Sequence, residues 1–118
     1  MENNIYATKK LLLNVGISPN LDGYHYLTEA INTVKGMLKS GDVDCKFTVL
    51  YKDIGKKFNT TSARTERSMR HAIEKAFSSN NSLLKTIFNS LVDTRSGKVT
   101  VSCFVFTIAE YLIMEEGI

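Results

Sequence analysis

Apolar side chains recur along most of the chain at the spacing of one helix face, with polar residues between them. The longest such stripe predicts a helix that begins at about Asp22, which can cap it, and ends at Ser40 and Gly41. The same spacing predicts four further helices, at about residues 4–15, 47–58, 63–77 and 83–91. Gly16 follows the first of these, where a left-handed C-cap residue belongs.

The segment at residues 99–106 is rich in β-branched and aromatic side chains, so its local preference is for a strand or for the wing of a winged helix. Beyond it, Val105 and Ile108 return to helical spacing. Thr100 or Ser102 is available as a cap for a helix that begins here. We therefore expect a final helix, and the fold class that follows is all-α, a compact six-helix domain.

Composition sets the limits of this picture. The chain has 118 residues, 43% of them apolar, which suits one globular domain over residues 1–118 that folds without metal or disulfide staples. Cys45 and Cys103 lie far apart with no pairing pattern, so we read them as apolar fillers and expect a reducing, cytoplasmic location. No apolar run approaches the roughly 20 residues of a membrane span. With no metal-ligand spacing, glycine-rich phosphate loop or nucleophile elbow, we expect no metal, no cofactor, no membrane partner and no enzyme activity.

Charge is distributed unevenly along the chain. Residues 46–77 include eight basic and three acidic side chains, whereas the remaining residues include seven basic and nine acidic ones. A basic third within a mildly acidic body suggests an anionic partner for that third. A solvated charged face is the alternative explanation of the charge excess alone.

Residues 47–77 have the pattern of a helix-turn-helix, in which two short helices cross steeply and need a small residue where they meet. Gly55 follows the apolar Ile54 and supplies that small residue. Asn59 tolerates the left-handed conformation that such a turn requires. The hydroxyls that can cap the next helix belong to Thr60, Thr61 and Ser62. The basic residues that close the first helix are Lys56 and Lys57.

The second helix of this pair, at about residues 62–77, separates into two faces. One arc holds Thr65, Met69, Ala72, Ile73, Ala76 and Phe77, and the other holds Arg64, Arg67, Arg70, His71 and Glu74. A guanidinium on the outer arc can pair with guanine O6 and N7 in a major groove, and Glu66 can either accept from cytosine N4 or orient Arg70 through an ion pair. A solvated amphipathic helix in an ordinary bundle is the alternative, because Thr65 and Ser68 stand where larger apolar residues are usual.

Three segments, at residues 23–31, 49–61 and 66–76, resemble the DNA-binding effector domains of the stage zero sporulation protein A family of response regulators. The most specific runs are DIGKKFNTT and ERSMRHAIE, and the similarity extends over residues 11–115. The resemblance implies a six-helix domain whose third and fourth helices form the helix-turn-helix. It also implies that the recognition helix reads a TGTCGAA-like box in the major groove of double-stranded DNA.

The resemblance also implies roles for individual residues. Base contacts are expected from Arg64, Glu66, Arg67, Arg70 and His71. Contacts with the DNA backbone are expected from Lys56, Lys57, Asn59, Thr60, Thr61, Ser62 and Lys75. The region of the fifth helix would meet the sigma factor of RNA polymerase, and the last helix would help two domains pair as a homodimer on tandem boxes.

Two departures from the family leave an alternative open. Family members have a phosphorylatable receiver domain before the effector domain, and this sequence has none, so it is either a cut-out effector domain or a free-standing relative. Residues 78–106 diverge most, and they include the region expected to contact the sigma factor. We interpret the chain as a sequence-specific transcription regulator of sporulation initiation. The alternative is a protein-interaction module, an antagonist that binds the sigma factor or a full-length regulator without specific DNA binding.

Overall fold

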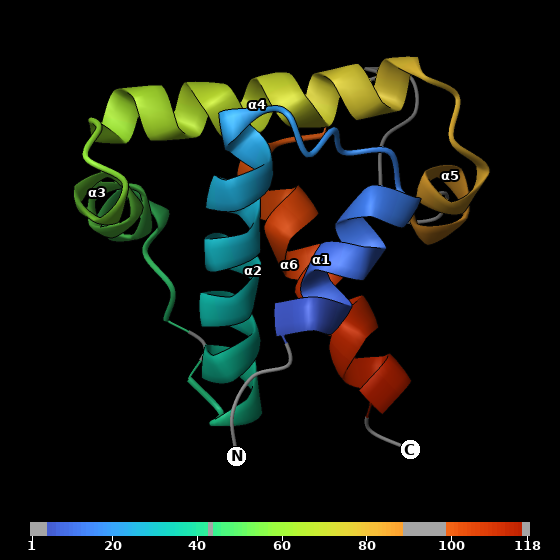
Figure 1. Cartoon of the computed structure of the whole chain (residues 1–118). Coiled ribbons are helices and arrows are strands. Elements are labelled where there is room, and N and C mark those ends of the chain that lie inside the picture. The colour runs from blue at the N-terminus through green and yellow to red at the C-terminus, as the bar shows by residue number, and fades with distance from the viewer. Residues whose placement is uncertain (1–4, 43, 89–98, 117–118) are drawn as a thin grey trace.

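The computed structural model describes residues 5–42, 44–88 and 99–116, and every regular element in these ranges is an α-helix. The helices are α1 (Ile5–Asn14), α2 (Asp22–Lys39), α3 (Phe47–Lys57), α4 (Ser62–Ser78), α5 (Ser82–Phe88) and α6 (Val101–Glu116). The expected all-α fold of six helices is confirmed (Figure 1). The part of the expected fifth helix beyond Phe88 lies outside the described residues.

The start of α6 shows how packing overrides local preference. Residues 101–106, which favour a strand by composition, are helical, so the expected final helix is confirmed there. Thr100 caps this helix, because its Oγ1 accepts a hydrogen bond from the Cys103 backbone N–H at 3.1 Å. The buried side chains of α6 are Val101, Phe104, Val105, Ile108, Ala109 and Leu112. Burying even one large apolar side chain yields about 1.5–3 kcal/mol, which exceeds the span of about 1 kcal/mol in strand propensity.

α2 and α6 form the centre of the molecule, and α4 lies across one end of both (Figure 1). α2 packs most extensively on α6 and next on α4, while α3 packs chiefly on α4. α1 lies against α2, and α5 contacts α6. In the described ranges no helix combines the length and the apolar character needed to cross a bilayer.

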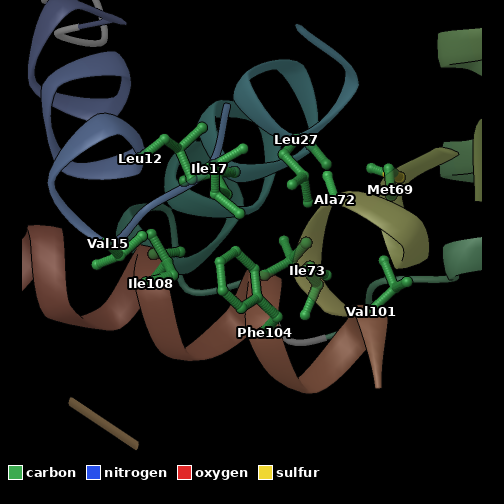
Figure 2. Close-up of a cluster of buried hydrophobic side chains, with 14 of the residues drawn as sticks. Leu12, Val15, Ile17, Leu27, Met69, Ala72, Ile73, Val101, Phe104 and Ile108 are labelled. Carbon is green, nitrogen blue, oxygen red and sulfur yellow. The ribbon is translucent and has the colours of Figure 1, made fainter. Parts of the chain in front are cut away.

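One hydrophobic core joins all six helices. Figure 2 shows Leu12 of α1, Leu27 of α2, Ile73 of α4 and Phe104 of α6 pointing toward one another, and each is at most 1% exposed. The Phe104 ring also stacks on Phe88 of α5, with the ring centroids 5.4 Å apart. The buried stripe of α4 is therefore part of the central core, which fixes the direction in which the opposite side of α4 faces.

One helix cap agrees with the sequence-based prediction and another does not. Gly16 has a φ of +94°, so the expected left-handed C-cap after α1 is confirmed. Asp22 does not cap α2: the N-cap is Leu21, which makes no side-chain hydrogen bond, and Asp22 is the first residue of the helix. The expectation of an Asp22 cap is therefore wrong. A carboxylate in the first turn still interacts favourably with the helix dipole.

At the end of α2 remote from α4, an ion-pair cluster joins α2 to α6. The Lys35 side chain is fully buried, and its Nζ contacts Glu116 Oε2. Lys39 Nζ lies 2.6 Å from the other oxygen of the same carboxylate. Hydrogen bonds from Lys35 and then Lys39 lower the pKa of Glu116 below its ordinary value, against the opposing effect of burial. The C-terminal end of α6 is thus held to α2 by charge as well as by apolar contact.

Candidate nucleic-acid interface

The connection between α3 and α4 is a tight turn built from the residues that the sequence singles out. Asn59 has a φ of +59°, so it adopts the expected left-handed conformation. The Thr60 N–H donates to the Gly55 carbonyl at 2.7 Å. A Cβ at Gly55 would lie 2.8 Å from the Thr60 carbonyl oxygen, which is too close for a side chain. Gly55 is therefore the small residue that lets the turn fold back on α3.

Thr61 is the residue that caps α4. Its Oγ1 accepts a hydrogen bond from the Arg64 backbone N–H at 3.1 Å. Of the three hydroxyls that the sequence offers as caps, the Thr61 hydroxyl is therefore the one that caps the helix. Thr65 is fully buried, and its hydroxyl donates to the Thr61 carbonyl at 2.8 Å. A threonine at this normally apolar position is therefore satisfied within the helix start and leaves no buried polar atom unpaired.

A close crossing of α2 and α4 explains the second unusual position, Ser68. A Cβ placed on Gly23 of α2 would lie 2.3 Å from the Ser68 carbonyl oxygen and 2.8 Å from the Ala72 Cβ. The two helix backbones thus approach each other where both side chains are small or absent. A large apolar residue at position 68 would have to fit into this crossing. Gly23 was not expected to have this role, although it lies in a segment of family resemblance.

α4 has the two faces that its sequence predicts. Its buried residues are Thr65, Met69, Ala72, Ile73 and Ala76, with Phe77 half-buried beside them. Its exposed residues on the other arc are Arg64, Arg67, Arg70, His71 and Glu74. In Figure 1, α4 runs along one edge of the molecule and the described helices all lie on one side of it, whereas α3 is seen almost end-on. The exposed arc of α4, called here the outer face, is therefore free to enter a groove.

The neighbours of this outer face define its electrostatics. Glu66 accepts a hydrogen bond from Arg70 Nε at 3.2 Å, so the ion pair foreseen as one of two roles for Glu66 is formed. Burial, followed by the nearby carboxylate of Glu66 and by Cys45, raises the pKa of Tyr51 to about 12. Burial and then Asp22 raise the pKa of Tyr26, and the Arg64 guanidinium lowers it. Side chains of α2 and α3 therefore lie within electrostatic range of the first turns of α4.

The start of α2 borders the outer face. A shallow hollow between the two helices is lined by Leu21, Asp22, Gly23, Arg67, Ser68 and His71. The Arg67 and His71 side chains are exposed at this hollow. The sequence-expected base readers are thus brought together on one surface, with Arg64, Arg67, Arg70 and His71 exposed and Glu66 half-buried.

The residues expected to contact the DNA backbone lie in three parts of the structure. Lys56 and Lys57 form the last turn of α3, as expected for cations at that end of a helix dipole. Asn59, Thr61 and Ser62 are exposed in and after the turn, with Thr60 half-buried. Lys75 is exposed in the last turn of α4, apart from the others.

One contact made by this group was missed by sequence reasoning. Lys57 Nζ lies 2.8 Å from Glu29 Oε2 of α2. Next to this pair, the rings of Phe58 and Tyr26 meet with their centroids 5.1 Å apart. Glu29 and Tyr26 are far from Lys57 and Phe58 in the chain, so no local spacing pattern could have indicated these contacts. Together they hold the end of α3 to α2.

Comparison with known families agrees with this geometry. Residues 8–112 match the model of a family described as "Sporulation initiation factor Spo0A C terminal". The match covers nearly the whole chain, including all of α2, α3, α4 and α5. The family resemblance noted on the three segments is confirmed. The chain therefore belongs to the Spo0A C-terminal family, the DNA-binding domain of a sporulation transcription regulator.

Proposed function

We propose that residues 1–118 act as one domain that binds double-stranded DNA in a sequence-specific manner, with α4 in the major groove of a TGTCGAA-like box. The observation that carries this proposal is the outer face of α4, where three arginines and a histidine project away from the core. α3, the turn and α4 have the order and tight connection of a helix-turn-helix. In such a unit the second helix enters the groove and the first crosses the DNA backbone.

We assign base reading to Arg64, Glu66, Arg67, Arg70 and His71. Arginine reads guanine best when its planar guanidinium is held in place, since less conformational freedom is then lost on binding. Glu66 holds Arg70 in this way through their ion pair. The Arg70 side chain is still 48% exposed, so its guanidinium is accessible to a base. Arg67 projects from the same face without an ion pair among the described residues. Arg67 and Arg70 are the main base readers in this proposal.

The phosphate and sugar contacts are assigned to side chains that flank the outer face. They are Lys56, Lys57, Asn59, Thr60, Thr61, Ser62 and Lys75. Contacts of this kind fix the register of a protein on DNA and supply affinity for any sequence. The Thr61 hydroxyl oxygen already accepts the bond that caps α4, so it has its hydrogen left to donate to a phosphate.

Two substitutions separate the roles of these groups. Arg67→Ala is expected to weaken binding to a box duplex by about 1–3 kcal/mol and to relax the base preference. Lys56→Ala is expected to weaken binding to box and scrambled duplexes alike and to flatten the salt dependence. Fluorescence anisotropy titrations over a range of salt concentrations measure both effects. Equal losses on box and scrambled DNA for both variants would contradict the role given to Arg67.

A second candidate function is favoured by an apolar hollow between α5 and α6. Its lining includes Ile87, Phe106, Tyr111 and Met114, and the Met114 side chain is 61% exposed. We propose this surface for contacts with protein, either with the sigma factor of RNA polymerase or with a second copy on tandem boxes. A titration of the wild type at physiological salt separates the two functions. Selective sub-micromolar binding to the box supports the regulator, whereas sigma-factor binding without selective DNA binding supports an interaction module.

A further inference from the structure

The lysines in the last turn of α3 differ in their surroundings. Lys56 is exposed and makes no ion pair with any described residue. Lys57 pairs with Glu29 of α2, with 2.8 Å between Nζ and Oε2. The Glu29 side chain is 26% exposed, against 58% for Lys57, so the carboxylate is the better anchored partner. Two adjacent cations of the same helix end therefore present different effective charge to an anionic surface.

The contact with Glu29 is part of a wider attachment of this helix end. Phe58, the residue after Lys57, packs its ring against Tyr26 of α2. The Lys57 ammonium lies 6.0 Å from the centroid of the Phe58 ring, at the limit of a cation–π contact. Tyr26 and Glu29 are one helical turn apart on α2, so both point toward the same end of α3. The attachment therefore directs Lys57 toward the body of the protein.

We propose that Glu29 is a positioning residue that keeps Lys57 on α2 and thereby reduces the affinity of the domain for DNA of any sequence. This inference rests on the proposed function and revises the contribution of one residue in it. A phosphate that approaches α3 must compete with Glu29 for the Lys57 ammonium. Because phosphate contacts supply sequence-independent affinity, the restraint lowers binding to box and scrambled DNA by the same factor. Lys56 keeps its full effect.

The test is a double-mutant cycle on the salt dependence of DNA binding. Four proteins are compared: the wild type, Glu29→Gln, Lys57→Ala and the double variant. Each is titrated with a box duplex and with a scrambled duplex over a range of salt concentrations. Glu29→Gln is expected to tighten binding to both duplexes by about two- to fivefold, the range of exposed ion pairs. It should also steepen the slope of log K against log salt by about 0.9, the value for one added phosphate contact.

Lys57→Ala distinguishes positioning from a merely structural role. In the Glu29→Gln background it is expected to return the slope to that of the wild type, whereas in the wild-type background it should change the slope little. Glu115→Gln is the matched control, since it removes one exposed carboxylate from α6, a helix that makes no described contact with Lys57. This control should leave the slope unchanged. Thermal unfolding of all the variants measures any loss of stability separately.

The possible failures are distinguishable. Parallel slopes for all four proteins of the cycle, with the wild type still selective for the box, would overturn the role of Glu29 and leave the proposed function intact. The same steepening from Glu115→Gln would mean that net charge alone causes the effect, and it would also overturn the role of Glu29. A wild type that binds neither duplex would overturn the proposed function, and the inference with it.

Discussion

α4 and α6 are helices of nearly equal length, 17 and 16 residues, with opposite surroundings. α4 buries one narrow stripe and exposes arginine, histidine and lysine on the rest of its circumference. α6 is predominantly apolar, and it runs through the centre of the molecule against α2 (Figure 1). The comparison teaches that stability and recognition are separated in this fold: α6 supplies much of the core, and α4 uses a small part of that core to hold an outward-facing surface.

The largest expected effect is the loss of stability from a substitution in the buried face of α6. Phe104 is fully buried and stacks on Phe88, so Phe104→Ala should lower the free energy of unfolding by about 3–5 kcal/mol. Phe106→Ala is the matched control on the same helix, because Phe106 is only half-buried, and it should cost distinctly less. Denaturant unfolding followed by circular dichroism measures both. Equal losses would mean that α6 does not have the central position described.

Gly23→Ala tests how α4 is held against the rest of the molecule. The added Cβ would lie 2.3 Å from the Ser68 carbonyl oxygen, so α2 and α4 must move apart. We expect a loss of about 1–3 kcal/mol in unfolding free energy. Helix propensity alone would favour alanine over glycine by about 1 kcal/mol. A stabilised variant would therefore show that the two backbones do not approach as closely as described.

Thr61→Ala weakens the start of α4 without altering its outer face. Loss of the capping hydrogen bond to the Arg64 N–H should cost about 1 kcal/mol of stability. Ser62→Ala, one residue later, is the control, since the cap described at this helix start is made by Thr61. Thermal unfolding should show a lower midpoint for Thr61→Ala than for Ser62→Ala. The same midpoint for both variants would contradict the capping role of Thr61.

The smallest expected effect is a pH dependence at the end of α6. Lys35 and Lys39 lower the pKa of Glu116, so the folded state binds this proton less readily than the unfolded state. The stabilisation is therefore complete above the ordinary glutamate pKa of about 4.3, and it is lost as the pH falls through the lowered value. Glu116→Gln should reduce stability at neutral pH, and its difference from the wild type should shrink on acidification. Parallel stability curves from neutral to acidic pH would contradict the ion pairs.

Local chemistry explains why the turn between α3 and α4 could be predicted in detail. Asn59 and Gly55 each meet a backbone requirement that few residue types satisfy, and Thr61 caps the helix that follows it directly. The two faces of α4 follow from helical periodicity alone. These features depend on residues close together in the chain, and the sequence contains them in full.

Contacts between distant segments could not be predicted in the same way. Nothing near Gly23 in the sequence indicates that the Ser68 backbone packs against it. Likewise, nothing near Glu29 indicates that it pairs with Lys57. The error at Asp22 has a related origin. An aspartate at a helix start fits either the cap or the first turn, and the structure places it in the first turn after Leu21.

The central claim is that Arg67 reads guanine from the outer face of α4, and one measurement tests it most directly. The wild type and Arg67→Ala are titrated with the box duplex and with duplexes in which one guanine at a time is replaced by 7-deazaguanine, which lacks the N7 acceptor. The account predicts that replacement of the guanine read by Arg67 weakens the wild type by about tenfold, within the range for one base contact, and leaves Arg67→Ala almost unaffected. An equal loss for both proteins at every guanine, or no loss for the wild type at any of them, would contradict it.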